Sequence, residues 1–189
     1  LAPENEMVLQ ITKKEQLKTV IEYIKSSSAR SEIDRMSDTK SITGVFTGSY
    51  ALHPLNGEQI PIWIGDYVLA GYGTGAVMAV PCGDQRDHDF AKYFSIPIKN
   101  IFSGIDVSEE AYSDKSDFKL NNSDFLDGLS YEESIEKIIS HIEEIGCGRG
   151  KINYRMRDAV FSRQRYWGEP IPIYYKNGVP VPIEEKKLP

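Results

Sequence analysis

Two aspartates three residues apart, in the segment Asp84-Gln-Arg-Asp87, are the residues of this chain best suited to chemistry. The spacing allows both carboxylates to stabilise the first turn of a helix, with Asp84 as the N-cap and Asp87 at the third helical position. It also allows one carboxylate to project from a strand–helix junction and hold a cation, such as the α-ammonium group of an amino acid. The two interpretations are compatible, because Asp84 can cap the helix while Asp87 faces a ligand.

The glycine-rich segment Gly71-Tyr-Gly-Thr-Gly75 is a second candidate site. A phosphate-binding loop must lead into a helix whose N-terminus faces the anion. This segment leads instead into Ala76-Val-Met-Ala-Val80, whose composition is typical of a strand, and no Lys-Ser or Lys-Thr pair follows the glycines. We therefore expect a bend at which backbone lies close to backbone or to a ligand, and a nucleotide enzyme of the P-loop type is disfavoured.

The histidines and cysteines show no spacing that is typical of a metal site or of a catalytic nucleophile. His53, His88 and His141 are scattered along the chain, and for each of them a packing or surface role is favoured. Cys82 and Cys147 stand apart from each other, which predicts two small buried thiols. We expect no metal site.

A basic and aromatic segment follows residue 148, with Arg149, Lys151, Arg155, Arg157, Arg163 and Arg165 interleaved with Tyr154, Phe161, Tyr166 and Trp167. Arginine alternating with aromatic residues is typical of surfaces that bind single-stranded nucleic acid. The alternative is a hinge whose arginines are solvated or pack on a neighbouring domain, and composition does not choose between the two.

The elements that must position these residues follow from capping patterns and hydrophobic periodicity. Thr12 with Glu15 and Ser130 with Glu133 both form capping boxes. We expect helices at 12–26, at 32–35, from 84 onwards and from 130 to 145. We expect strands at 45–54, 60–64, 66–70, 76–80, 96–102, 171–175 and 179–183, with hairpin turns at Asn56-Gly57 and Asn177-Gly178. The fold class predicted is α+β and mostly β: an antiparallel, barrel-like sheet with a few peripheral helices.

Composition limits the function of the 189-residue chain, which has 22 basic and 28 acidic residues and a net charge of -6. No apolar run approaches the roughly 20 residues of a membrane-spanning helix. The acidity argues against a globally basic nucleic-acid binder. The excess of acid is concentrated in residues 106–127, however, which we interpret as a solvated loop or a variable insertion.

Four segments in order carry a resemblance to a known family. Thr74-Gly-Ala-Val-Met-Ala-Val-Pro81, followed by Asp84-Gln-Arg-Asp87, resembles the editing-domain signature of the leucyl-tRNA synthetase family. The segment 53–63 resembles the upstream hairpin of the same family. The segments 153–158 and 162–172 resemble the region in which class I synthetases of the Leu/Ile/Val group return to the catalytic core. The acidic stretch lies outside this resemblance.

The resemblance implies an editing domain over residues 1–150, and returning strands that lead to a catalytic core over 151–189. Such a domain carries out post-transfer editing, the hydrolysis of the ester of mischarged tRNA(Leu). Editing is needed because a hydrophobic synthetic site discriminates against a missing methylene by only about 1–3 kcal/mol. The implied partners are the tRNA(Leu) 3′ end, a non-cognate aminoacyl group and the rest of the synthetase, in a cytoplasmic monomer. Editing itself needs no cofactor, and ATP serves a synthetic site whose signatures this chain lacks.

The resemblance also implies roles for single residues. Asp87 corresponds to the carboxylate that binds the α-ammonium group, and with Asp84 it makes up the predicted catalytic pair. The predicted substrate-binding residues are Arg86 beside this pair, Met78 in the pocket wall, Leu69 and Tyr72 near the terminal adenosine, and Thr74.

The sequence departs from the family pattern at two places. Gly83 stands where the family usually has a histidine. The family's threonine-rich peptide, which supplies the opposite wall, lies upstream of the segment resembling Leu1-Ala-Pro-Glu4, so we expect this chain alone to be weak or inactive in hydrolysis. Two alternatives follow: an insertion that positions the tRNA 3′ end without hydrolysis, or a structural insertion whose aspartates only cap a helix.

Overall fold

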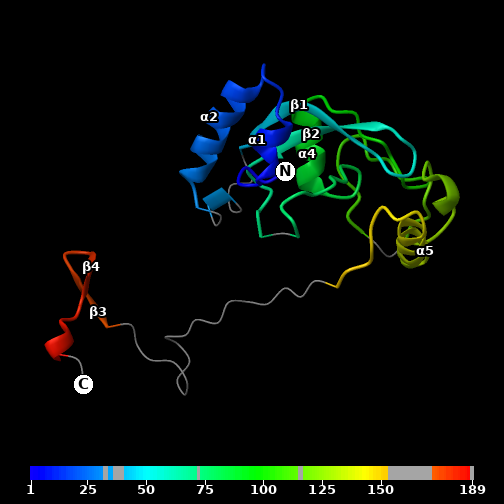
Figure 1. Ribbon diagram of the computed structural model, residues 1–189. Helices are drawn as coiled ribbons and strands as arrows, with labels where there is room; N and C mark the ends of the chain where they lie inside the picture. Colours follow the sequence, from blue (N-terminus) through cyan, green and yellow to red (C-terminus); the bar gives the residue numbers. More distant parts are fainter. Residues whose placement is uncertain (32–33, 36–40, 72, 115–116, 153–171, 188–189) are drawn as a thin grey trace. The chain divides into compact units, whose positions relative to one another are not determined.

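The computed structural model describes residues 1–31, 34–35, 41–71, 73–114, 117–152 and 172–187 (Figure 1). The chain forms two compact units, Leu1–Lys151 and Ile152–Pro189. The first contains α1 (Met7–Ile11), α2 (Leu17–Ser28), β1 (Gly44–Leu52), β2 (Gln59–Gly65), α4 (Gln85–Tyr93), η1 (Asp124–Leu126) and α5 (Tyr131–Glu144). The second contains β3 (Ile173–Lys176), β4 (Val179–Pro182) and η3 (Glu185–Lys187).

The first unit is built on the antiparallel hairpin of β1 and β2, which confirms the hairpin predicted from Asn56-Gly57. The register shifts between Phe46 and Tyr50, where Gly48 has a φ of +82°. Glycine adopts this conformation at little cost, so the irregularity lies where the sequence permits it.

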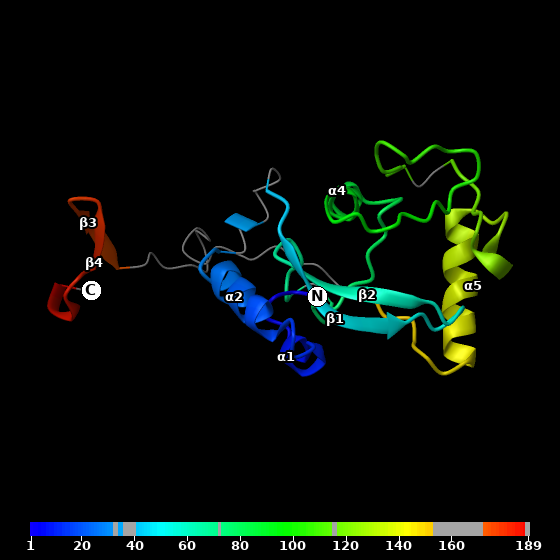
Figure 2. The same ribbon diagram turned by 90° about the horizontal axis from the view of Figure 1, so that it is seen from above.

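Helices α1 and α2 cover this hairpin (Figure 2). Helix α2 corresponds to the helix predicted over 12–26 but begins only at Leu17, and α1 lies before the predicted range. Thr12 is not an N-cap: it is the C-cap of α1, and its hydroxyl donates to the carbonyl of Val8. The hydroxyl of a threonine can bond the carbonyl four residues before it, and this contact competes with the predicted capping box. Val8, Val20 and Ile64 are fully buried together and join both helices to β2.

The predicted barrel is wrong for the described residues, which form two separate two-stranded antiparallel sheets and a few helices, a mixed α/β arrangement. The segments 66–70 and 76–80 are not strands. The chain turns directly after β2, and Gly73 and Gly75 have positive φ angles. The predicted strand at 96–102 is reduced to one bridge between Phe102 and Leu120.

Helix α4 is attached to the hairpin by aromatic side chains. Phe90 and Phe94 pack together with their ring centroids 4.7 Å apart, and Phe94 lies 4.6 Å from Trp63 of β2. Gly44 leaves room for this contact, because a Cβ there would lie 2.5 Å from the Phe90 ring. The C-terminal half of α4 is therefore packed on the hairpin.

The acidic stretch 106–127 is not simply solvated. Its apolar residues form a second core, in which Val107 is buried with Cys82 and Phe102 while Tyr112 and Phe118 pack around them. The predicted burial of both thiols holds for Cys82, whose pKa is raised by burial, but Cys147 is exposed. The single apolar residues between the acids gave no periodic signal, which is why this core was missed.

Helix α5 begins at the predicted capping box, and its isoleucine face is only partly covered, with Ile135 and Ile139 each 37% exposed. In the second unit, β3 and β4 form the second predicted hairpin. Asn177 and Gly178 both have positive φ angles at its turn, as an Asn-Gly turn requires. Of the basic segment, only Arg149 and Lys151 lie in the described residues, where both are exposed. The rest of that segment and both motifs after residue 152, except for Pro172, lie outside the described residues.

Candidate functional site

Asp84 caps α4, as one of the two interpretations predicts. Its backbone is extended, and its Oδ1 accepts a hydrogen bond of 3.1 Å from the backbone N–H of Asp87. This contact satisfies one of the free donors of the first turn. The carboxylate of Asp84 therefore positions the backbone of Asp87.

Asp87 has a different role, because its carboxylate binds no group of its own helix. Its Oδ1 accepts a hydrogen bond of 2.7 Å from the hydroxyl of Tyr67, and its Oδ2 accepts one of 2.8 Å from the backbone N–H of Val80. Both distances lie in the normal range for hydrogen bonds. Two segments outside α4 therefore fix the carboxylate, and each oxygen keeps a lone pair for a cation.

Tyr67 is the residue at this junction that the sequence did not reveal. Burial raises the pKa of its hydroxyl well above the ordinary value, and the hydrogen bond to Asp87 raises it further. The hydroxyl is therefore a proton donor over the whole physiological range. The only signal in the sequence was a tyrosine within an expected strand, which indicates packing rather than a contact to a residue 20 positions later.

The structure brings some of the other predicted substrate-binding residues near Asp87 and leaves others apart. Arg86 lines a small cavity of about 40 Å³ that Tyr67 also lines. Leu69 is half-buried, whereas the side chain of Met78 is 60% exposed. Thr74 is exposed, and its carbonyl accepts a hydrogen bond from the side chain of Asn5. Tyr72 lies outside the described residues.

The segment that donates to Asp87 presents an apolar surface. Val77 and Val80 are each 44% exposed, beside the more exposed Met78. It is not helical, so the glycine-rich segment before it does not lead into a helix N-terminus. This agrees with the exclusion of a phosphate-binding loop, although the expected strand is absent.

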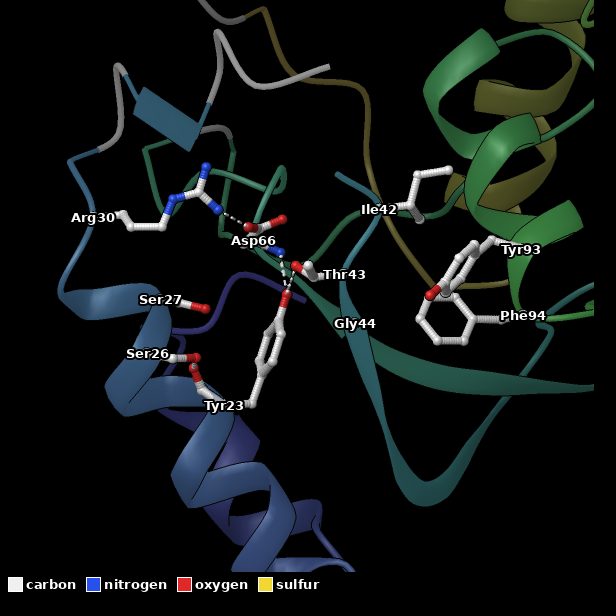
Figure 3. A pocket seen from close by; sticks show the side chains of 10 residues that line it. All are labelled: Tyr23, Ser26, Ser27, Arg30, Ile42, Thr43, Gly44, Asp66, Tyr93 and Phe94. Atoms are coloured by element: carbon white, nitrogen blue, oxygen red, sulfur yellow. Dashed lines mark hydrogen bonds and ion pairs between the residues drawn. The ribbon is translucent and has the colours of Figure 1, made fainter. Parts of the chain in front are cut away.

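The larger cavity, about 470 Å³, lies between α2, the start of β1 and the end of α4 (Figure 3). Arg30 pairs with Asp66 across it at 2.9 Å, and the hydroxyl of Tyr23 contacts Thr43 and the backbone N–H of Asp66. Of the predicted substrate-binding residues that the structure describes, none lines this cavity.

The histidines have packing or local roles, as predicted. His88 is buried, and its Nε2 lies 3.0 Å from the carbonyl oxygen of Val107, while His141 packs on Phe125. His53 accepts a hydrogen bond from the backbone N–H of Leu55. Within the described part of the chain, no three His, Cys, Asp or Glu side chains are grouped as a metal site requires.

At Gly83, a Cβ would fit, because it would make only ordinary contacts of 3.4 Å to Phe102 and 3.5 Å to Val80. Among the residues that the structure describes, no helix is both long enough and apolar enough to cross a membrane.

Comparison with known proteins decides the family. A family model described as "Leucyl-tRNA synthetase, editing domain" matches residues 1–143. The chain belongs to the leucyl-tRNA synthetase editing-domain family. The match includes residues 106–127, so the expectation that the acidic stretch lies outside the resemblance is wrong.

Relatives named leucine–tRNA ligase resemble the whole chain. The protein from Christiangramia forsetii is 61% identical over 189 residues, and that from Flavobacterium johnsoniae is 58% identical over 194 residues. A solved structure, the ternary complex of Agrobacterium radiobacter K84 agnB2 LeuRS, tRNA and LeuAMS, is 32% identical with a TM-score of 0.62 and covers the full chain. The chain spans 20% of the length of each of these proteins.

Proposed function

We propose that this chain is the editing part of a longer leucyl-tRNA synthetase, and that the longer protein hydrolyses the ester of mischarged tRNA(Leu) at a site to which this chain contributes. This chain alone is weak or inactive in hydrolysis in this proposal. The family match over residues 1–143 supports the editing role. The observation that carries the proposal is the carboxylate of Asp87, which two segments outside its own helix hold at the start of α4.

Asp87 binds the α-ammonium group of the non-cognate aminoacyl ester in this proposal. The remaining lone pairs of its carboxylate suit an ammonium group, which donates three hydrogen bonds. Holding the ammonium group places the ester carbonyl in one position relative to an attacking water. The ester bond then breaks, releasing the free amino acid and the 3′-hydroxyl of the tRNA. Asp84 contributes by capping the turn that carries Asp87.

The neighbouring residues would bind the rest of the substrate. We assign the wall of the amino-acid pocket to Met78 and the approach of the terminal adenosine to Leu69 and Tyr72, with Thr74 and Arg86 as further contacts. The exposure of Met78 beside Val77 and Val80 supports an apolar surface there that is available to an aliphatic side chain.

The proposed partners are the tRNA(Leu) 3′ end and the rest of the synthetase, in a cytoplasmic monomer. Editing requires no cofactor in this proposal. ATP would serve the synthetic site of the longer protein, and the residues described here do not suit its phosphates, because Gly71–Gly75 does not lead into a helix.

The test is hydrolysis of norvalyl-tRNA(Leu) by the full-length protein that carries this chain, with Asp87→Ala compared with Asp89→Ala. Asp89 lies on the same helix and contacts the side chain of Gln85 rather than Tyr67 or Val80. We expect Asp87→Ala to lower kcat/KM by about two orders of magnitude, since it leaves the ammonium group without its partner. We expect Asp89→Ala to stay near the wild-type value.

Two results would contradict the proposal. A wild-type protein that binds the tRNA but does not hydrolyse the ester would favour the insertion that only positions the tRNA 3′ end, an alternative that Gly83 motivates. Undiminished hydrolysis by Asp87→Ala would favour the structural insertion.

A further inference from the structure

The contact between Tyr67 and Asp87 at the proposed site is not needed for the capping of α4. The hydroxyl of Tyr67 donates to Oδ1 of Asp87 at 2.7 Å. The N–H of Val80 holds the other oxygen, so the Tyr67 contact decides how the plane of the carboxylate is turned.

The ring of Tyr67 is fixed independently of Asp87. It packs against Phe90, with the ring centroids 5.6 Å apart. It also lies over Gly65, where a Cβ would come within 2.9 Å of the ring. The hydroxyl is therefore held in place before it meets the carboxylate, so that little rotamer freedom is lost on making the contact.

The backbone beside Tyr67 is also fixed. The N–H of Asp66 donates to the hydroxyl of Tyr23 at 2.9 Å, and its carboxylate pairs with Arg30 at 2.9 Å. Helix α2 carries Tyr23, and Arg30 lies just after its end. The position of the Tyr67 ring is thus set from three directions: α2, β2 and α4.

We propose that Tyr67 is the positioning residue that orients the Asp87 carboxylate toward the α-ammonium group of the aminoacyl ester. This proposal rests on the proposed function. Tyr67 acts through Asp87 and contacts no reacting atom itself. Because its hydroxyl keeps its proton, it contacts Asp87 as a donor and adds no negative charge beside the carboxylate.

The test compares two substrates in the full-length protein: norvalyl-tRNA(Leu) and the tRNA ester of the matching 2-hydroxy acid, which lacks the ammonium group. The ratio of their kcat/KM values reports recognition of the ammonium group. We expect Tyr67→Phe to lower this ratio about tenfold, the lower range for a hydrogen bond to a charged group. If Tyr67 had a purely structural role, Tyr67→Phe would change kcat/KM for both substrates by the same factor and leave the ratio unchanged.

Tyr112→Phe is the matched control. It removes a hydroxyl from a tyrosine in the other core, where the hydroxyl contacts the carbonyl of Asp117, and we expect its ratio to equal that of the wild type. In an Asp87→Asn background, where the preference is already lost, Tyr67→Phe should cause no further change in the ratio.

The outcomes separate the two proposals. If Asp87→Asn collapses the ratio while Tyr67→Phe keeps the wild-type value, the positioning role is wrong and the proposed function stands. If Tyr67→Phe lowers the ratio equally with and without Asp87, it does not act through the carboxylate. If Asp87→Asn keeps the wild-type ratio, the proposed function fails.

Discussion

Helices α4 and α5 begin with the same pattern, a capping residue followed three positions later by an acid, and they use it differently. At α5, Glu133 accepts a hydrogen bond of 2.8 Å from the backbone N–H of Ser130, which closes the capping box. At α4, the carboxylate of Asp87 does not return to Asp84 but binds Tyr67 and Val80.

The two acids differ in what binds their carboxylates, although they occupy the same position in the helix. The side chain of aspartate is one methylene shorter than that of glutamate, and Asp87 is bound by groups from other parts of the chain. The acid of α5 is satisfied by a contact three residues away, and that helix presents partly exposed isoleucines. The acid of α4 is fixed by the tertiary structure, which is what a binding carboxylate requires.

The largest expected effect is a loss of stability on removing the packing beneath α4, compared with the packing beneath α5. Phe90→Ala removes a ring that is 7% exposed and should lower the free energy of unfolding by about 3–5 kcal/mol. Ile139→Ala, on the partly exposed face of α5, should lower the free energy of unfolding by clearly less than Phe90→Ala does. Urea unfolding of both variants measures the difference, and equal costs would show that α4 is no more firmly packed than α5.

Asp87→Glu keeps the charge of the acid at α4 but moves its carboxylate. The N–H of Asp84 already donates to the carbonyl of Val80, so the longer side chain gains no capping box, but it keeps an acid in the first turn of the helix, and we expect thermal stability close to that of the wild type. Hydrolysis of norvalyl-tRNA(Leu) by the full-length protein should fall by about two orders of magnitude, because the carboxylate leaves its fixed position. Retained hydrolysis would show that the position of this carboxylate is not critical.

Removing each capping residue gives a smaller effect that separates structure from function. Asp84→Ala and Ser130→Ala should each cost about 1 kcal/mol of stability. Only Asp84→Ala should also lower the rate of editing, because Asp84 holds the backbone of Asp87. A loss of editing in Ser130→Ala of the same size would mean that the effect reflects general stability.

The smallest effect is the pH dependence of the α5 capping box. Hydrogen bonds from the backbone and side chain of Ser130, together with nearby Lys119, hold the pKa of Glu133 below its ordinary value. A lowered pKa means that the contribution to stability is present above the ordinary pKa and is lost as pH falls through the folded value. The protection factors of the amides in the first turn of α5, which correct for the intrinsic pH dependence of exchange, should therefore fall at acid pH, whereas Glu133→Gln should show no such step.

Local patterns predicted the caps at Asp84 and Ser130 and both Asn-Gly hairpins, because each depends on a few neighbouring residues. The Thr12 box failed because a helix already ended at that residue and its hydroxyl bonded the preceding turn. The contact of Tyr67 with Asp87 and the core beneath residues 106–127 were beyond prediction. Both depend on residues far apart in sequence, for which spacing carries no signal.

The family resemblance predicted a role for Asp87, and the packing around this residue comes only from the structure. The exposure of Met78 and the absence of a barrel among the described residues likewise depend on which segments pair in space. The expected strand at 76–80 had a suitable composition, yet Val80 uses its N–H on Asp87.

The most direct test of the central claim is the ratio of kcat/KM for norvalyl-tRNA(Leu) to that for its 2-hydroxy ester, measured for the wild-type full-length protein and for Asp87→Asn. If Asp87 binds the α-ammonium group, the wild type prefers the amino ester by about two orders of magnitude and Asp87→Asn hydrolyses both esters at similar low rates. A wild type without this preference, or an Asp87→Asn variant that keeps it, would contradict the claim.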